Sequence, residues 1–510
     1  MTKDLGYPQD AMFDRWNDEG LALTFDDVRL RTGYTEKSPD AISLISRITR
    51  NIEVKIPFVS APMDTVTESA TAIEMALQGG IGVIHYNLEV AKQASQVKRV
   101  KHYVHGIIET PITVSQDETV GSVLEMRAKK GYKFHSFPVV DDEGKVVGLM
   151  TRNDFSIFRN EPNKPISAAM TRDLITGTAD MPMKRAYDLM VEKKKKALPL
   201  LGVDQRLVGM IVLTDAERAL QGQSSAYNVD AKGSLRVGAA IGTREEDLDR
   251  AEKLVEAGVD LLVIDTAHAD TPYAVQTIRA LKNTFPHVDI LVGNVSEPAS
   301  ARRLADAGAD GIKVGQGGGS ICTTRDVTGT GCPQVSAVYN CARELRGSGI
   351  PVMSDGGARS SGDSVIALAC GASSVMYGSM FAGTDEAPGH VFDHEGRKVK
   401  IIRGMGSLEA QLERAGSRGR YQSGSKRIVA EGVQGVVEYK GALSEVLADL
   451  TARVRKGFWN IGAFTVPDLH AKALFMRITG SGLAEGHAHS IVTVPKLSHT
   501  SPTISGRSAS

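Results

Sequence analysis

The chain has 510 residues, so two or more domains are expected. Apolar residues make up 42%, charged residues 24%, and the formal net charge is zero, as in soluble globular proteins; nothing here indicates nucleic acid as a main partner. The four cysteines form no CxxC pair, and we find neither a signal peptide nor a run of about 18 apolar residues. These features predict a cytoplasmic protein without disulfides or a membrane span.

The first part of the chain predicts a polar arm followed by one βα unit. Residues 1 to about 22 are polar and are expected to form a loose arm. Residues 57–68 (PFVSAPMDTVTE) predict a buried strand that runs into a loop, and residues 79–85 (GGIGVIH) predict a second strand. The alanine-rich segment 69–77 between them predicts a helix. Strand, helix and strand with short loops are typical of a parallel βα unit.

Residues 110 to about 220 break this pattern and contain an internal repeat. The first half begins ITVSQDE and the second begins LITGTAD. Each half has an extended entry, an amphipathic helix, an apolar strand, a polar turn and a second apolar strand. The repeat therefore predicts a separate module inserted between two parts of another domain.

Six more short apolar strands are predicted after this insertion, at residues 236–242, 261–268, 290–295, 311–315, 351–357 and 374–379. Helical segments such as 246–257 and 297–307 lie between them. With the two early strands the count is eight, and near-continuous apolar strands indicate a parallel sheet buried on both faces. Eight βα units predict a TIM (β/α)8 barrel. A doubly wound sheet is the alternative, but no GxGxxG follows the first strand.

Polar residues follow the predicted strands, where a TIM barrel carries its active site. They are Asp265, Asn294, Ser320, Cys322, Asp355 and Ser379. Capping of the next helix is the alternative explanation for each one alone. The sequences DGG at 355–357 and YGS at 377–379 end strands seven and eight. Their backbone N–H groups are suited to a phosphate.

The loop at residues 315–334, GQGGGSICTTRDVTGTGCPQ, contains a candidate nucleophile. Three consecutive glycines at 317–319 permit close approach of the backbone to a ligand. Cys322 lies among hydroxyls and beside Arg325, and a nearby cation lowers a thiol pKa. A buried structural cysteine is the alternative, and local chemistry alone leaves the two equally open.

The motif GSICTTR at 319–325 resembles the active-site loop of the IMP dehydrogenase/GMP reductase family. The segments LTFDDV at 23–28, RGMGSL at 403–408 and RITGSGLAEGHAHSI at 477–491 are similar to other parts of the family, and the resemblance covers nearly the whole chain. It implies a TIM barrel with an inserted tandem CBS (Bateman) domain, in a homotetramer or larger homo-oligomer. The implied divisions are 1–108 for the arm and first barrel part, 109–222 for the CBS pair, 223–493 for the rest of the barrel with a mobile flap at about 403–435, and 494–510 for a disordered tail.

The resemblance implies NAD-dependent oxidation of IMP to XMP. The thiolate of Cys322 would add to C2 of the hypoxanthine, a hydride would leave to NAD⁺, and water would hydrolyse the adduct. Arg420 and Tyr421 match the family's water-activating flap dyad, with Thr324 and Glu431 as proton partners. GMP reductases resemble the chain elsewhere but lack the dyad and have a shorter lid. NADPH-dependent deamination of GMP is therefore the alternative, and a non-catalytic nucleotide sensor is a further one.

Other roles are carried over position by position. The IMP-binding residues would be Met63, Ser320, Asp355, Gly356, Gly357, Met376, Gly378, Ser379, Gly404, Met405 and Gly406. Asp265 and Asn294 would lie on the nicotinamide side. Carbonyls of Gly317, Gly319 and Cys322, with those of Glu485, Gly486 and His487 from a neighbouring subunit, would hold a potassium ion. ATP or a guanine nucleotide would bind the CBS pair through Thr151, Asp154 and Asp215, although Val212 replaces the usual hydroxyl in the second half. Dimerisation without a ligand is the alternative for that module.

The chain departs from the family pattern at a few positions. Gln316 and Gly318 replace an apolar residue and the usual Pro or Ser of the cysteine loop, and Gly318 gives that loop more conformational freedom. Ala-Asp follows DTAH where Gly-His is common. Ile402 replaces a tyrosine that donates to the substrate phosphate, and losing one such bond costs about 1.5–3 kcal/mol.

Overall fold

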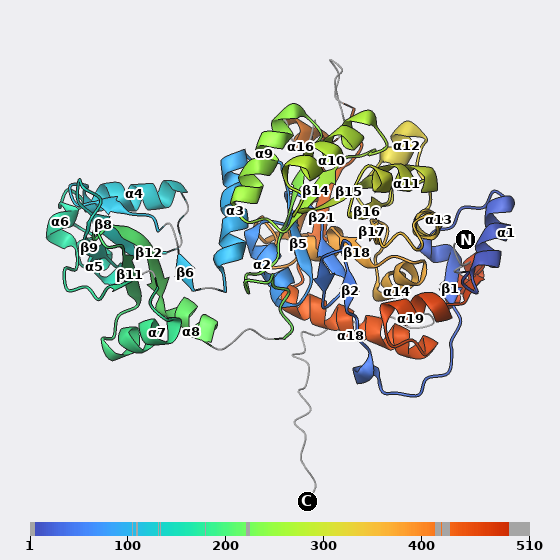
Figure 1. Ribbon diagram of the computed structural model, residues 1–510, viewed down its shortest axis with the longest axis horizontal. Helices are drawn as coiled ribbons and strands as arrows, with labels where there is room; N and C mark the ends of the chain where they lie inside the picture. The colour runs from blue at the N-terminus through green and yellow to red at the C-terminus, as the bar shows by residue number, and fades with distance from the viewer. Residues whose placement is uncertain are drawn as a thin grey trace, which may run out of the picture.

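The computed structural model describes residues 6–104, 106–108, 111–130, 132, 134–178, 180–220, 225–413, 420 and 429–488. Its centre is a closed barrel of eight parallel strands in the order β13, β14, β15, β16, β17, β18, β4 and β5 (Figure 1). The strands are β4 (Phe58–Ser60), β5 (Ile81–Ile84), β13 (Gly238–Ile241), β14 (Leu261–Asp265), β15 (Asp289–Val295), β16 (Gly311–Val314), β17 (Val352–Asp355) and β18 (Ser374–Tyr377). The predicted TIM barrel is confirmed.

The inserted module lies between β5 and β13 in the sequence, and about 150 residues separate these strands. They nevertheless pair with each other, and this pairing completes the barrel. Every residue of β4, β5, β13, β14, β15 and β16 is buried, which explains the continuous apolar runs in the sequence. Alternate side chains point inward and outward. Val59, Val263 and Met353 belong to an inner cluster, whereas Phe58, Leu262 and Val352 belong to the cluster beneath the helices.

Helices cover the outside of the barrel (Figure 1). They include α2 (Ser69–Leu77), α3 (Val90–His102), α9 (Glu245–Glu256), α10 (Pro272–Thr284), α11 (Pro298–Asp306), α13 (Gln334–Glu344), α14 (Ser361–Ala369) and α18 (Leu443–Ile461). The helix expected at 69–77 is confirmed with the same bounds. Local sequence fixes several starts: Thr271 caps α10 with Pro272 at its first position, and Ser360 caps α14.

The amino-terminal segment is not a loose arm where the structure describes it. Helix α1 (Asp10–Asp18) buries Phe13, whose ring stacks on Tyr339 of α13 at 3.5 Å between centroids. Burial raises the pKa of Asp10, but hydrogen bonds from Arg346 and Tyr339 prevail and lower it to about 2. The expectation was wrong for these residues because the polar sequence hides one apolar face, whose partners lie more than 300 residues away.

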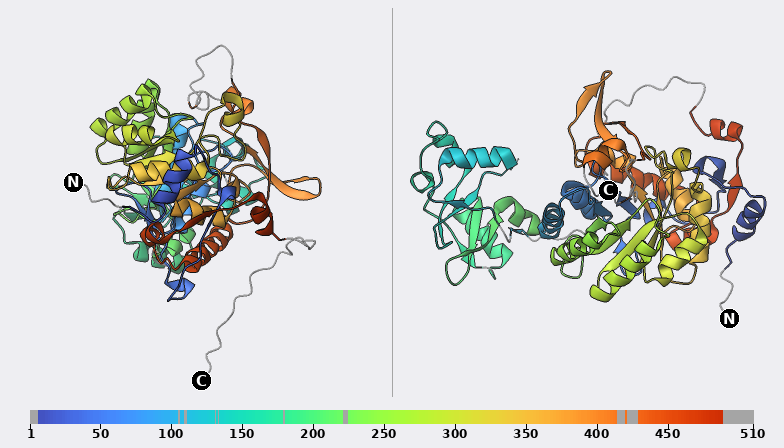
Figure 2. Two further views of the ribbon diagram at one scale, coloured as in Figure 1. Left: turned by 90° about the vertical axis from the view of Figure 1, so that its right-hand side faces the viewer. Right: turned by 90° about the horizontal axis from the view of Figure 1, so that it is seen from above.

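The inserted module forms two small sheets of its own, beside the barrel (Figures 1 and 2). The first contains β7 (Val114–Ser115), β8 (Phe137–Val140) and β9 (Val146–Met150), with helices α4 (Val120–Lys130) and α5 (Arg152–Ile157). The second contains β6 (Ile107–Ile108), β12 (Leu207–Val212), β11 (Ala197–Leu201) and β10 (Gly177–Thr178), with helices α7 (Met183–Glu192) and α8 (Leu213–Leu220). Each half has its own apolar core, as the internal repeat predicts.

An antiparallel sheet of three strands projects from the barrel (Figure 2). It consists of β19 (Phe392–His394), β20 (Arg397–Arg403) and β21 (Gln434–Glu438). The expected flap runs from the end of β20 to the start of β21, and its residues 414–419 and 421–428 lie outside the described part of the chain. Within the described residues, no helix is both long and apolar enough to span a bilayer.

Candidate active site

The cysteine loop runs from the end of β16 to the start of α13 and is braced by Arg325. The Arg325 guanidinium donates to the carbonyls of Gln316 and Cys332, at 2.9 and 2.6 Å. Gly317 has φ +73°, and a Cβ there would lie 2.4 Å from the Arg325 side chain. A glycine is required at 317 for this reason. The guanidinium thus holds the loop through backbone carbonyls.

Cys322, Thr324 and Glu431 form a short line of polar groups. The half-buried Cys322 Sγ lies 3.1 Å from Thr324 Oγ1, and this hydroxyl donates to Glu431 Oε2 at 2.9 Å. Because the hydroxyl proton goes to the carboxylate, the thiol donates to the hydroxyl oxygen. The line is a route for the thiol proton. Cys332 differs, because burial raises the pKa of its thiol to about 11.

The two ends of the flap lie directly on the cysteine loop. Val433 N donates to Ile321 O at 3.0 Å, and Glu431 N donates to Gly406 O at 2.9 Å. A Cβ at either Gly404 or Gly432 would lie 3.0 Å from Ile321 O, so both positions favour glycine. The segment 404–406, expected to bind IMP, is therefore held beside Cys322.

The expected phosphate loops meet as the TIM-barrel prediction requires. Ser320 Oγ donates to Ser379 Oγ at 2.9 Å, which joins the loops after β16 and β18. Gly356 and Gly357 have φ +89° and +81°, and a Cβ at Gly356 would lie 3.2 Å from Gly319 N. On the other side, Met63 Sδ lies 2.9 Å from the place of a Cβ at Gly378. Glycine backbone and two hydroxyls thus come together at one end of the barrel.

A buried lysine that the sequence reasoning missed joins three expected site residues. Lys313 Nζ donates to Asp265 Oδ1 at 2.9 Å, to Asp355 Oδ2 at 2.7 Å and to the Asn294 side-chain oxygen. Asn294 Nδ2 also donates to Asp355 Oδ2 at 2.8 Å. The Lys313 side chain is fully buried, and its three N–H groups meet three acceptors. A lone lysine in the apolar strand GIKVG was the available signal.

Arg420 reaches this network from the flap. Its guanidinium pairs with the buried carboxylate of Asp265, and its carbonyl accepts from Ala267 N at 3.0 Å. Two carboxylates, Asp265 and Asp355, are then balanced by two cations, Lys313 and Arg420. Without Arg420 the cluster carries one negative charge, so it can accept one other cationic group. Tyr421, the second residue of the expected dyad, lies outside the described residues.

The expected nucleotide residues of the CBS pair have structural partners in this chain. Asp154 Oδ2 accepts from Thr151 N and Oγ1 at 2.8 and 2.6 Å, a capping box of α5, and Thr171 donates to Oδ1 at 3.1 Å. Val212 ends β12, and Asp215 lies in the first turn of α8. Thr151 and Asp154 are brought together, as capping residues.

The expected potassium ligands fall into two groups. Gly317, Gly319 and Cys322 share the cysteine loop, where Gly319 O accepts from Cys322 N at 3.1 Å. Glu485 ends the short helix α20 (Gly480–Glu485), Gly486 caps it, and His487 follows. Helix α20 lies against residues 25–27 of the same chain.

Ile402 does not face an open phosphate site. Its side chain is 2% exposed and belongs to the main apolar core. Tyr377, which ends β18, does not replace the missing donor, because its hydroxyl pairs with Ser364. Burial raises the Tyr377 pKa. Neither residue therefore offers a free donor.

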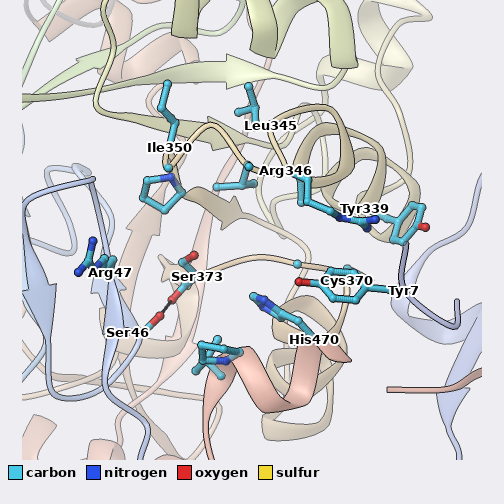
Figure 3. A pocket seen from close by; sticks show the side chains of 18 of the residues that line it. Tyr7, Ser46, Arg47, Tyr339, Leu345, Arg346, Ile350, Cys370, Ser373 and His470 are labelled. Carbon is cyan, nitrogen blue, oxygen red and sulfur yellow. Dashed lines mark hydrogen bonds between the residues drawn. The ribbon is translucent and has the colours of Figure 1, made fainter. Parts of the chain in front are cut away.

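A cavity of about 410 Å³ lies at the opposite end of the barrel (Figure 3). Pro351 and Ser373, which come directly before β17 and β18, line it together with Tyr7 and His470. One of its charged groups, Arg346, is already paired with Asp10. The cavity is separate from the cysteine loop and from the network of Lys313.

Comparison with known proteins places this geometry among purine nucleotide enzymes. The model of the IMP dehydrogenase / GMP reductase domain matches residues 22–489. The chain is 43% identical to the inosine-5'-monophosphate dehydrogenase of Aquifex aeolicus over 471 residues, 92% of this chain and 95% of that protein. It is 41% identical to the inosine-5'-monophosphate dehydrogenase of Haemophilus influenzae, over 92% of this chain and 96% of that protein. The crystal structure of GMP reductase from Trypanosoma brucei with guanosine 5'-monophosphate matches with a TM-score of 0.80 and 34% identity, over 93% of this chain and all of that one.

Proposed function

The chain belongs to the IMP dehydrogenase/GMP reductase family, and we propose that it oxidises IMP to XMP with NAD⁺ through a covalent adduct on Cys322. The observation that carries this choice within the family is the flap arginine. Arg420 lies on Asp265, next to the network that includes Asn294 and Asp355. A dehydrogenase needs a group that activates water after hydride transfer, and the contact of Arg420 with Asp265 supports this role for Arg420.

In the first step Cys322 gives up its proton and adds to C2 of the hypoxanthine. The proton leaves through Thr324 toward the carboxylate of Glu431, along the 3.1 and 2.9 Å contacts. C2 becomes tetrahedral and then loses its hydrogen as a hydride, which bound NAD⁺ accepts. Asp355 holds the ribose hydroxyls, while Ser320 and Ser379 hold the phosphate. These contacts orient the purine ring toward Cys322, which lowers the entropic part of the activation free energy.

In the second step water breaks the bond between Cys322 and C2 and releases XMP. Arg420 occupies the place on Asp265 once the reduced dinucleotide has left, a conformational step of the kind that can limit turnover. Arginine is an unusual base because its ordinary pKa is above about 12. Tyr421 and Glu431 are the partners with which it would share the proton.

The charge of the network fits a nicotinamide ring. Without Arg420, the group of Asp265, Asp355 and Lys313 carries one net negative charge, and the oxidised nicotinamide ring carries one positive charge. Reduction neutralises the ring and removes this attraction. Arg420 and the oxidised ring would therefore take turns beside the carboxylate of Asp265. Asn294 holds the second carboxylate of the network, that of Asp355, in place.

A potassium ion fits the donor set of the cysteine loop. Backbone carbonyl oxygens replace the hydration shell of potassium in other proteins. Gly317, Gly319 and Cys322 would supply carbonyls from one subunit, and Glu485, Gly486 and His487 would supply them from a neighbour. The chain would then act as a homotetramer or larger homo-oligomer, and the ion would hold the loop that carries the nucleophile.

GMP reductase remains the second candidate, because a solved structure of that enzyme covers this chain almost completely. It would use Cys322, Thr324 and Glu431 to deaminate GMP with NADPH. The contact of Arg420 with Asp265 favours the dehydrogenase, since a deamination does not need that water-activating group.

A coupled pair of assays tests the proposal. We expect the purified protein to form NADH from IMP and NAD⁺, faster in potassium than in sodium at the same ionic strength. With GMP and NADPH we expect neither ammonia nor NADPH consumption. Ammonia release from GMP without activity on IMP would assign the chain to the reductases, and no reaction in either assay would favour a non-catalytic nucleotide sensor.

The CBS pair is proposed to regulate assembly or activity without taking part in chemistry. ATP or a guanine nucleotide would bind through Thr151, Asp154 and Asp215, and binding at Asp154 must displace its capping bonds. Replacing residues 109–222 with a short linker should keep turnover within about threefold of the native enzyme, because none of the module's described residues belongs to the barrel core. Steady-state NADH formation measures this. A folded variant without turnover would contradict it.

A further inference from the structure

The side chain of Gln316 ties together the loops that follow three adjacent barrel strands. Its Nε2 donates to Ala267 O at 3.0 Å and lies 3.2 Å from His268 Nδ1. Its Oε1 accepts from Ser296 Oγ at 2.7 Å, and Ser296 is only 6% exposed. The loops after β14, β15 and β16 thus meet on one amide, at a position where the sequence departs from its family.

The residue that Gln316 holds also holds the flap. Ala267 accepts from Gln316 through its carbonyl and donates through its N–H to the carbonyl of Arg420, at 3.0 Å. Asp265, two residues earlier, pairs with the Arg420 guanidinium. Both anchoring points of Arg420 therefore lie on a segment that Gln316 fixes relative to the cysteine loop.

The backbone of Gln316 is held as firmly as its side chain. Its carbonyl accepts from Arg325 Nε at 2.9 Å, and Arg325 also donates to Cys332 O. The backbone of Gln316 is therefore fixed to the cysteine loop, and its side-chain amide holds Ala267 at a set distance from that loop. An apolar side chain at 316 would fill the same space but could form none of these bonds.

We propose that Gln316 is a positioning residue that stabilises the state in which Arg420 occupies Asp265, and so favours hydrolysis of the adduct over retention of the dinucleotide. This inference rests on the proposed two-step reaction. The bonds involved are neutral and partly buried, so together they shift the balance between the two states by about threefold to tenfold.

The Gln316→Met variant tests the proposal, because methionine keeps the length and loses the hydrogen bonds. The NADH burst from IMP should stay within about twofold of native, while steady-state turnover falls by about threefold to tenfold and the KM for NAD⁺ falls with it. The KM falls because Arg420 competes less well for Asp265. Ser296→Ala should give a smaller change in the same direction, and adding it to Gln316→Met should change nothing further.

The matched control is Gln276→Met, an exposed glutamine on the outer helix α10, which should behave as native. If Gln316→Met matches the native enzyme, or if burst and steady state fall together, the positioning role is wrong. Ser296→Ala decides the same question should the methionine variant not fold. Failure of the proposed reaction would be distinct, because the native protein itself would then form no NADH from IMP.

Discussion

Replacement of Cys322 by alanine should abolish NADH formation from IMP at every stage, including the first turnover. In the proposed reaction the Cys322 sulfur first bonds to C2, and the hydride can leave only after this bond has formed. Removal of a nucleophile typically lowers turnover by about 10⁴-fold or more. IMP should still bind, because the proposed phosphate contacts are to Ser320 and Ser379, which lie together, and the proposed ribose contact is to Asp355. Stopped-flow absorbance and equilibrium binding of IMP measure the two quantities.

The control for this result is Cys332→Ala, ten residues farther along the same loop. Burial raises the pKa of the Cys332 thiol to about 11, so the thiol stays protonated, and only its backbone carbonyl is used, by Arg325. This variant should keep turnover within about twofold. A Cys322→Ala protein that binds IMP and still gives a burst of NADH would show that the hydride leaves without covalent activation.

Replacement of Arg420 by alanine should separate the two chemical steps. The cysteine, its proton route through Thr324 and the substrate contacts remain, so a burst approaching one NADH per active site is expected. Steady-state turnover should then fall by roughly 10²-fold or more, as for a lost general base. The physical reason is that Arg420 reaches Asp265 from a segment outside the barrel, whereas Cys322 lies on a braced loop.

An exposed arginine provides the control for Arg420. Arg453 on α18 pairs only with its helix neighbour Asp449 among the contacts described, and Arg453→Ala should leave both phases unchanged. If Arg420→Ala binds IMP but gives no burst, Arg420 contributes to hydride transfer or to closure over the substrate. The division between the two steps would then be wrong.

The barrel could be predicted because each strand is a short, mostly apolar run that ends in, or is followed at once by, a glycine or a polar residue. This pattern follows from local burial alone, as in β14 (LLVID) and β16 (GIKV). The packing of α1 could not be predicted in the same way. Phe13 and Trp16 lie in a polar stretch, and their core partners, such as Tyr339 and Phe475, lie hundreds of residues away.

The site residues divide in the same way, into those that a contiguous sequence motif identifies and those that only distant contacts identify. The cysteine loop and the glycines around it are contiguous motifs, so their residues could be named from the sequence. The side chains of Lys313 and Gln316 bind partners on several other strands and loops, and no local sequence pattern specifies those partners. An unexpected residue type at each position was the sign of a role: a lysine in an apolar strand, and a glutamine where the family resemblance implies an apolar residue.

The mass of the protein trapped during turnover tests the central claim most directly. Arg420→Ala should be mixed with IMP and NAD⁺, quenched with acid after the NADH burst and analysed by intact and peptide mass spectrometry. We predict one oxidised nucleotide per chain, attached to the peptide that contains Cys322, in an amount equal to the NADH formed. A full burst of NADH with unmodified Cys322, or with the nucleotide on another residue, would contradict the covalent two-step reaction.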